Sequence, residues 1–186
     1  MTHFEYVMVI VSIILGLGLT VVLRGLSKLA RSAKPSAVVA IWGFFLLFLF
    51  LQTWWGMWDM NQIEQWTQPD FLFVAIYACI LYGMAELMLP MASRPDTDWN
   101  AHFLSIRVWY FSLQTFLAIL AITLTWSQLD VPLTHPYRIV QSFIVIMSLI
   151  ALTTRNMRVH LWIAVSVIVG LQAGQIVFRL IPGLQG

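Results

Sequence analysis

The chain has 186 residues, of which 60% are hydrophobic and only 10% are charged, with a formal net charge of +2. Soluble domains are about 45–50% apolar and about 25% charged, so a water-soluble fold of this length could not bury so much apolar surface, and a lipid bilayer is the expected solvent. The small, scattered charge argues against a nucleic-acid partner. Cys79 is the single cysteine, which excludes an intramolecular disulfide and a cysteine-rich metal site.

Apolar segments long enough to cross a bilayer follow one another along the whole chain. A spanning helix needs about 20 mostly apolar residues, and six segments qualify: 4–24, 37–58, 71–90, 103–126, 137–154 and 160–182. The breaks between them carry turn chemistry, in Pro35, Pro69, Pro90, Pro132 and the Arg155-Asn156 pair. We therefore predict an all-α, polytopic integral membrane bundle of six transmembrane helices that forms one domain over residues 1–186.

The cations fall mainly in alternate connections. Eight of the ten lie after the first, third and fifth segments or at the start of the next one: Arg24, Lys28, Arg31, Lys34, Arg94, Arg107, Arg155 and Arg158. Because cytoplasmic loops carry an excess of Lys and Arg, we predict that both termini lie on the non-cytoplasmic side. Tryptophans at both predicted interfaces support this frame, Trp42, Trp99 and Trp162 at the inner one. Size and composition suggest the bacterial inner (plasma) membrane.

Small residues form rows on the first and last segments. Ser12, Gly16 and Thr20 recur every fourth residue, and the row continues into Arg24 and Lys28. Such rows let helix backbones approach closely in lipid, so this one is either a packing seam or the wall of a path for a polar solute. Gly170 and Gly174 form a GxxxG pair on the last segment, which we interpret as a helix-contact surface.

Two charged residues are expected at membrane depth. Glu86 lies one turn before Pro90, and Arg107 lies just inside the next segment, beyond a short connection. Charge within a bilayer usually has a partner or a function, so we predict an intramembrane charge pair of Glu86 with Arg107, with Arg24 as a second partner. Such a pair either fixes helix register or takes part in gating or proton-linked transport. Snorkelling of each charge to the interface is the remaining interpretation.

Uncharged polar residues give a second group. Gln52, Gln141 and Gln175 lie in the outer halves of their segments. They either make interhelical hydrogen bonds or line a polar outer vestibule.

Sequence motifs for catalysis or cofactor binding do not occur in the chain. It contains no HExxH and no TVGYG, and its four histidines, His3, His102, His135 and His160, fall at predicted helix ends or in loops. We therefore expect no catalytic residue, metal or cofactor, and we favour a protein that is not an enzyme. The best hypothesis is a pore or carrier for a small ion or solute, assembled as a homo-oligomer in the lipid bilayer. The alternative is a non-catalytic accessory, scaffold or sensing subunit bound to another membrane protein in a larger complex.

The orientation is directly testable. With Cys79 replaced by alanine, a cysteine added after Gly186 should react with a membrane-impermeant thiol reagent in intact cells, because the cation asymmetry places the C-terminus outside. Labelling that requires cell lysis would reverse the predicted orientation.

Overall fold

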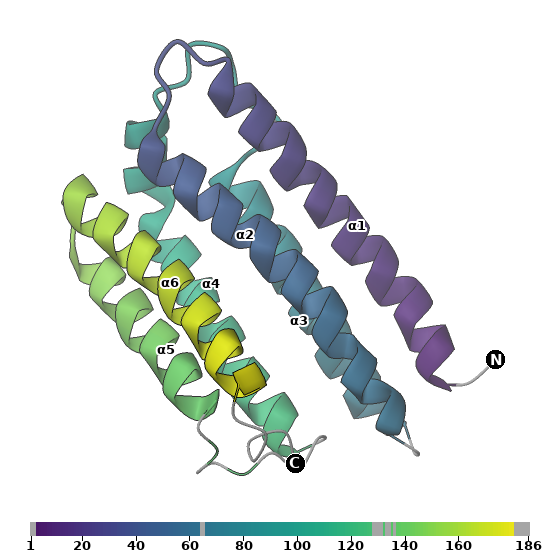
Figure 1. Ribbon diagram of the computed structural model, residues 1–186. Helices are drawn as coiled ribbons and strands as arrows, with labels where there is room; N and C mark the ends of the chain where they lie inside the picture. Colours follow the sequence, from purple (N-terminus) through teal and green to yellow (C-terminus); the bar gives the residue numbers. More distant parts are fainter. Residues whose placement is uncertain (1–2, 64–65, 128–131, 133–134, 136, 181–186) are drawn as a thin grey trace. The chain divides into compact units, whose positions relative to one another are not determined.

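The structure is a computed structural model that describes residues 3–63, 66–127, 132, 135 and 137–180. These residues form helices and no strand. The helices are, in order, α1 (His3–Ala30), α2 (Ala37–Gly56), the 3-10 helix η1 (Met57–Gln62), α3 (Gln68–Met88), α4 (Trp99–Ser127), α5 (Tyr137–Thr153) and α6 (Met157–Leu180) (Figure 1). The predicted all-helical architecture is confirmed for this part of the chain.

Membrane-spanning length is reached by most of these helices. Five stretches are long and apolar enough to cross a membrane: His3–Ala30, Ala37–Gln62, Gln68–Met88, Trp99–Ser127 and Met157–Gly174. The fifth predicted span corresponds to α5, whose apolar stretch Arg138–Thr153 is shorter. Several helices extend beyond the predicted spans; α1, for example, runs six residues further. The added residues include Lys28. A helix can continue past the hydrocarbon region where its side chains are polar.

The chain divides into two compact units, Met1–Ile106 and Arg107–Gly186, with the division inside α4. The first unit contains α1, α2, α3 and the start of α4, and the second contains the rest of α4 with α5 and α6. A single domain over residues 1–186 stays a prediction.

Polar side chains begin several of the helices. The Ser36 hydroxyl accepts from the Val39 N–H at 3.3 Å at the start of α2. The Asp70 carboxylate accepts from the Thr67 N–H at 2.9 Å at the start of α3. The Asp98 carboxylate accepts from the Asn100 and Ala101 N–H groups at 3.1 and 3.0 Å at the start of α4. These bonds satisfy N–H groups that the first helical turn leaves without a partner.

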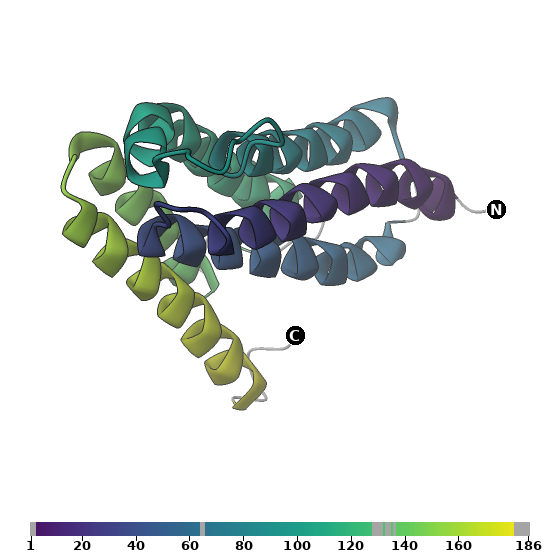
Figure 2. The same ribbon diagram turned by 90° about the horizontal axis from the view of Figure 1, so that it is seen from above.

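Glycines set the spacing of the helices in the first unit, where α1 lies beside α2 and α3 (Figures 1 and 2). A Cβ atom at Gly18 of α1 would lie 2.3 Å from the Phe50 ring of α2. A Cβ atom at Gly43 of α2 would lie 2.7 Å from Leu26 of α1. Only hydrogen at these positions lets the two backbones approach so closely.

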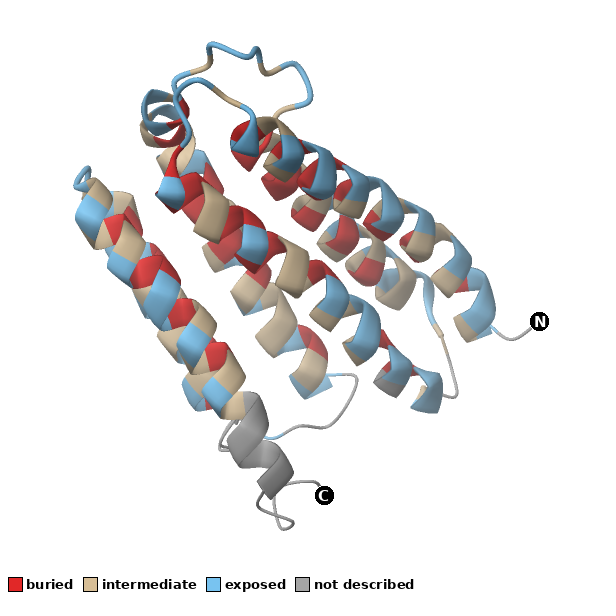
Figure 3. Ribbon diagram, turned by 45° about the horizontal axis from the view of Figure 1, so that its top comes forward, coloured by how far each residue is buried: buried red, intermediate tan, exposed pale blue. Residues whose placement is uncertain are grey.

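One face of α1 packs against the rest of this unit, and the opposite face is exposed (Figure 3). The buried face follows helical spacing through Val11, Leu15, Gly18, Val22, Gly25 and Leu29.

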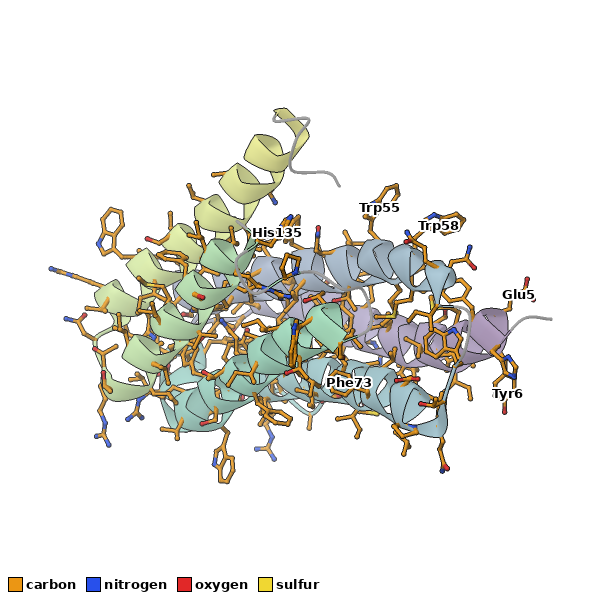
Figure 4. All side chains as sticks on the ribbon, turned by 90° about the horizontal axis from the view of Figure 1, so that it is seen from below. Glu5, Tyr6, Trp55, Trp58, Phe73 and His135 are labelled. Atoms are coloured by element: carbon orange, nitrogen blue, oxygen red, sulfur yellow. The ribbon has the colours of Figure 1, made fainter. Side chains whose placement is uncertain are left out.

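The tryptophans of the first unit differ in their exposure. Trp42 and Trp99, predicted to lie at the inner interface, are buried. Trp55 and Trp58, by contrast, project outward from the end of α2 and from η1, with exposed fractions of 74% and 73% (Figure 4).

In the second unit, α5 and α6 lie side by side (Figure 1). A Cβ atom at Gly170 would lie 3.2 Å from the Phe143 ring, and one at Gly174 would lie 2.7 Å from Val140. The GxxxG pair therefore faces α5. The helix contact that these two glycines make is one between two helices of the same chain.

Two glycines on α1 offer a matched test of this packing. Gly18→Ile should lower the free energy of unfolding by about 1–3 kcal/mol, because the new side chain must displace Phe50. Gly16→Ile, two residues earlier, should leave the free energy of unfolding of the single protomer nearly unchanged, because nothing else in the chain lies within 4 Å of a Cβ there. Thermal melting of the monomeric protein in detergent measures both. Equal losses would contradict the assignment of the buried face.

Candidate functional site

Buried polar side chains are concentrated in the second unit. Among the described residues the buried polar set consists of Ser36, Gln114, Arg138, Gln141, Ser148 and His160. All except Ser36, which begins α2, belong to Arg107–Gly186. Because burying a polar group in an apolar surrounding is unfavourable unless it is hydrogen-bonded, such a concentration marks this unit as the candidate site. We call the five members of this set that lie in Arg107–Gly186, together with Thr125 and Phe111, the polar ladder.

Arg138, in the first turn of α5, forms one end of the polar ladder. Its guanidinium donates to the Thr125 hydroxyl at 2.6 Å and to the Gln141 side-chain carbonyl at 2.7 Å. It also donates to the carbonyl groups of Ile122 at 3.3 Å and Pro132 at 3.4 Å. The side chain therefore ties α5 to the end of α4 and to the connection between them. The sequence places Arg138 at a helix end but gives no signal for its burial.

Gln114 and Ser148 form the middle of the polar ladder. The Gln114 amide donates to the Ser148 hydroxyl at 3.0 Å, and that hydroxyl donates to the Ile144 carbonyl at 2.7 Å. Gln114 is 2% exposed, and its side-chain carbonyl has no hydrogen-bond partner among the described residues. Reversing the amide would only exchange the problem, because the Ser148 hydrogen is already donated. One polar group of Gln114 therefore remains available in the interior.

His160, near the start of α6, forms the other end. Its ring is fully buried and stacks on Phe111 of α4, with ring centroids 5.5 Å apart and an interplanar angle of 10°. The Nε2 atom lies 3.1 Å from the Thr154 carbonyl oxygen. The sequence predicts an interfacial histidine at position 160, and only the contact of Phe111 of α4 with α6 shows that His160 is buried.

The three parts of the polar ladder lie at successive depths along α4. Thr125 follows Gln114 by eleven residues, about 16 Å of helix, and Phe111 precedes Gln114 by about one turn. Leu117 and Leu124 are buried between Gln114 and Thr125. Hydrogen-bonding groups therefore occur at both ends of the polar ladder and in its middle. The two leucines separate the middle from the end at Arg138. No cluster of metal-ligating side chains occurs among the described residues.

The three glutamines of the predicted vestibule fall in different places. Gln141 belongs to the polar ladder, where it accepts from Arg138. Gln52 is half-buried on α2 in the first unit, and the side chain of Gln175 lies outside the described residues. The vestibule stays a prediction, and Gln141 is its only member that the structure places among other buried polar groups.

The row of Ser12, Gly16 and Thr20 lies on α1 away from the buried face. Gly16 and Thr20 are exposed, Ser12 is half-buried, and a Cβ at Gly16 would meet nothing within 4 Å. The Thr20 hydroxyl donates to the Gly16 carbonyl at 2.8 Å. Its hydrogen is therefore satisfied within α1 and needs no polar partner on another helix, so the row can face lipid or another helix equally well.

Glu86 of the predicted charge pair makes two hydrogen bonds to nearby residues. Its carboxylate accepts from the Met91 N–H and from the Tyr82 hydroxyl, each at 3.4 Å. Arg24 is exposed and makes no hydrogen bond or ion pair with the described residues, so the structure does not bring it to Glu86. Arg107 belongs to the other unit, and its pairing with Glu86 stays a prediction.

Comparison of the chain with protein-family models, with curated proteins and with solved structures gives no match.

A double-mutant cycle tests the charge pair. Glu86→Gln and Arg107→Gln should each destabilise the protein by about 3–5 kcal/mol, because each leaves the other charge without its partner in a poorly hydrated place. The double variant should recover much of that loss.

The same cycle with Arg24→Gln provides the control. Since Arg24 is exposed, its effect and that of Glu86→Gln should add. Additive losses in the Glu86/Arg107 cycle would show that these two residues do not interact.

Proposed function

We propose that the protein carries a small ion or polar solute across a membrane, with the polar ladder of the second unit as the route. The observation that supports this proposal is the location of the buried polar residues: among the described residues, all of them except the helix cap Ser36 lie in the second unit. Polar residues within a membrane bundle commonly mark substrate or ion pathways, since they are costly to bury for packing alone.

The middle of the polar ladder is the proposed binding position. The Gln114 carbonyl lacks a donor there, and leaving a buried acceptor unsatisfied costs about 1–3 kcal/mol. A solute or ion that donates hydrogen bonds, such as an ammonium-type cation or a small amide, would supply what this carbonyl lacks. Leu117 and Leu124 would then separate the bound solute from the Arg138 end.

We further propose the arrangement in the membrane. The five long helices and the shorter α5 cross a bacterial inner membrane six times, with both termini on the non-cytoplasmic side. The exposed row of Ser12, Gly16 and Thr20 would form the contact between protomers of a homo-oligomer, because the Gly16 position leaves space for a neighbouring helix.

A second function is supported by the same row. An accessory or scaffold subunit needs an outward helix face free of internal contacts, and this face of α1 meets that requirement. In that case the polar ladder would serve to hold α4, α5 and α6 together, as the bonds of Arg138 do.

Flux through purified protein in liposomes tests the first function. Ammonium entry is followed with an enclosed pH dye, and uncharged solutes are followed by light scattering after an osmotic shift. Gln114→Leu should reduce flux at least tenfold, because it removes the available acceptor without changing the charge of the protein.

A matched serine pair controls for folding. Ser148→Ala removes the buried hydroxyl that Gln114 contacts, whereas Ser142→Ala changes an exposed serine of the same helix. Only the first should reduce flux. Absence of flux for every solute, together with a lowered melting temperature of Gln114→Leu, would favour the accessory function, in which this side chain serves only to hold the helices together.

A further inference from the structure

Four cations of the first unit are exposed and have no acidic partner among the described residues. The side chains of Arg24, Lys34 and Arg94 make no hydrogen bond or ion pair with the described residues, and Arg31 bonds only to the hydroxyl and carbonyl of Ser27. Three of them, Arg31, Lys34 and Arg94, lie outside the helices α1 and α3, immediately beyond their apolar stretches. At that place they reach the depth of lipid headgroups if the helices cross a bilayer.

Hydrogen bonds hold the two loops that carry these cations together. The Ala33 N–H donates to the Pro95 carbonyl at 3.2 Å, and the Ser32 hydroxyl donates to the same carbonyl at 3.3 Å. The Lys28 ammonium also donates to the Met91 carbonyl. The α3–α4 loop is itself fixed by a turn in which the Arg94 N–H donates to the Thr97 hydroxyl at 2.9 Å.

This connection brings like charges together. Lys34 follows Ala33 and Arg94 precedes Pro95, so the two cations flank one backbone hydrogen bond. The cation of Arg31 stands at the end of α1, just before the same loop. Asp96 and Asp98 are the exposed acids of this loop, and Asp98 also caps α4. Three cations against these two carboxylates leave an excess of one positive charge that an anion would neutralise.

We propose that Arg31, Lys34 and Arg94 bind the phosphate-bearing headgroup of an anionic phospholipid. The phosphate matches the cations in charge, the position beyond the apolar helices matches the depth of a headgroup, and Arg in particular suits phosphate oxygens. The acyl chains of the same lipid lie along the apolar helices below, where Leu23 of α1 is exposed. This site is independent of the polar ladder and of the transport proposed for it.

Native mass spectrometry of the detergent-solubilised full chain tests the site, with phosphatidylglycerol and phosphatidylcholine as probes. The protein should retain phosphatidylglycerol in preference to phosphatidylcholine. Lys34→Gln combined with Arg94→Gln should weaken phosphatidylglycerol binding about 25-fold, at about fivefold for each cation near the surface, which corresponds to about 1 kcal/mol each. Because neither side chain makes a described bond, the variant should fold and melt as the unaltered protein does.

Two matched variants separate this site from general attraction. Arg155→Gln with Arg158→Gln removes the same charge from exposed positions of the second unit and should leave phosphatidylglycerol binding unchanged. Asp96→Asn should strengthen it. Equal weakening by both double variants would overturn the proposal in favour of net charge alone. Equal retention of both lipids, or displacement of phosphatidylglycerol by millimolar inorganic phosphate, would also overturn it.

Discussion

Hydrogen bonds must be completed within the chain wherever its surroundings are hydrocarbon, because no water is present to replace a missing partner. The helices meet this requirement for the backbone, and the hydroxyl side chains meet it in the same way. Thr20, Thr115 and Thr123 each donate to the carbonyl four residues earlier, at 2.8, 2.8 and 3.0 Å. A threonine that satisfies itself in this manner can face lipid, so polarity in the sequence does not by itself indicate a path.

The two units satisfy the constraint in different ways. The first unit has a nearly apolar interior, and close approach of backbones holds it together. Gly18 and Gly43 provide that approach, because a methyl group at either position would collide with a neighbouring side chain. Van der Waals contact is the main source of helix association where the hydrophobic effect is absent, so the close approach that these glycines allow contributes to the stability of this unit.

The second unit instead contains polar groups that bond across its helices. Arg138 connects α5 to α4, Gln114 connects α4 to Ser148 of α5, and His160 of α6 stacks on Phe111 of α4. Bonds of this kind fix the mutual rotation of helices more strictly than apolar contact does, because they demand direction as well as distance. The side-chain carbonyl of Gln114 has no hydrogen-bond partner among the described residues, which is the reason for placing the proposed binding position there.

Composition and apolar length alone determine that this chain is helical and suited to a membrane, because both follow from local sequence. The breaks at Pro35, Pro69 and Asn156 are likewise local, and helices begin near each of them. Which face of a helix is buried is not local. The row of Ser12, Gly16 and Thr20 and the row through Gly18 and Gly25 both have helical spacing, and only the position of Phe50 and Leu89 selects the second for internal contact. The burial of Arg138 and His160 likewise cannot be predicted from the sequence, because a residue at a helix end becomes buried only when a neighbouring helix covers it.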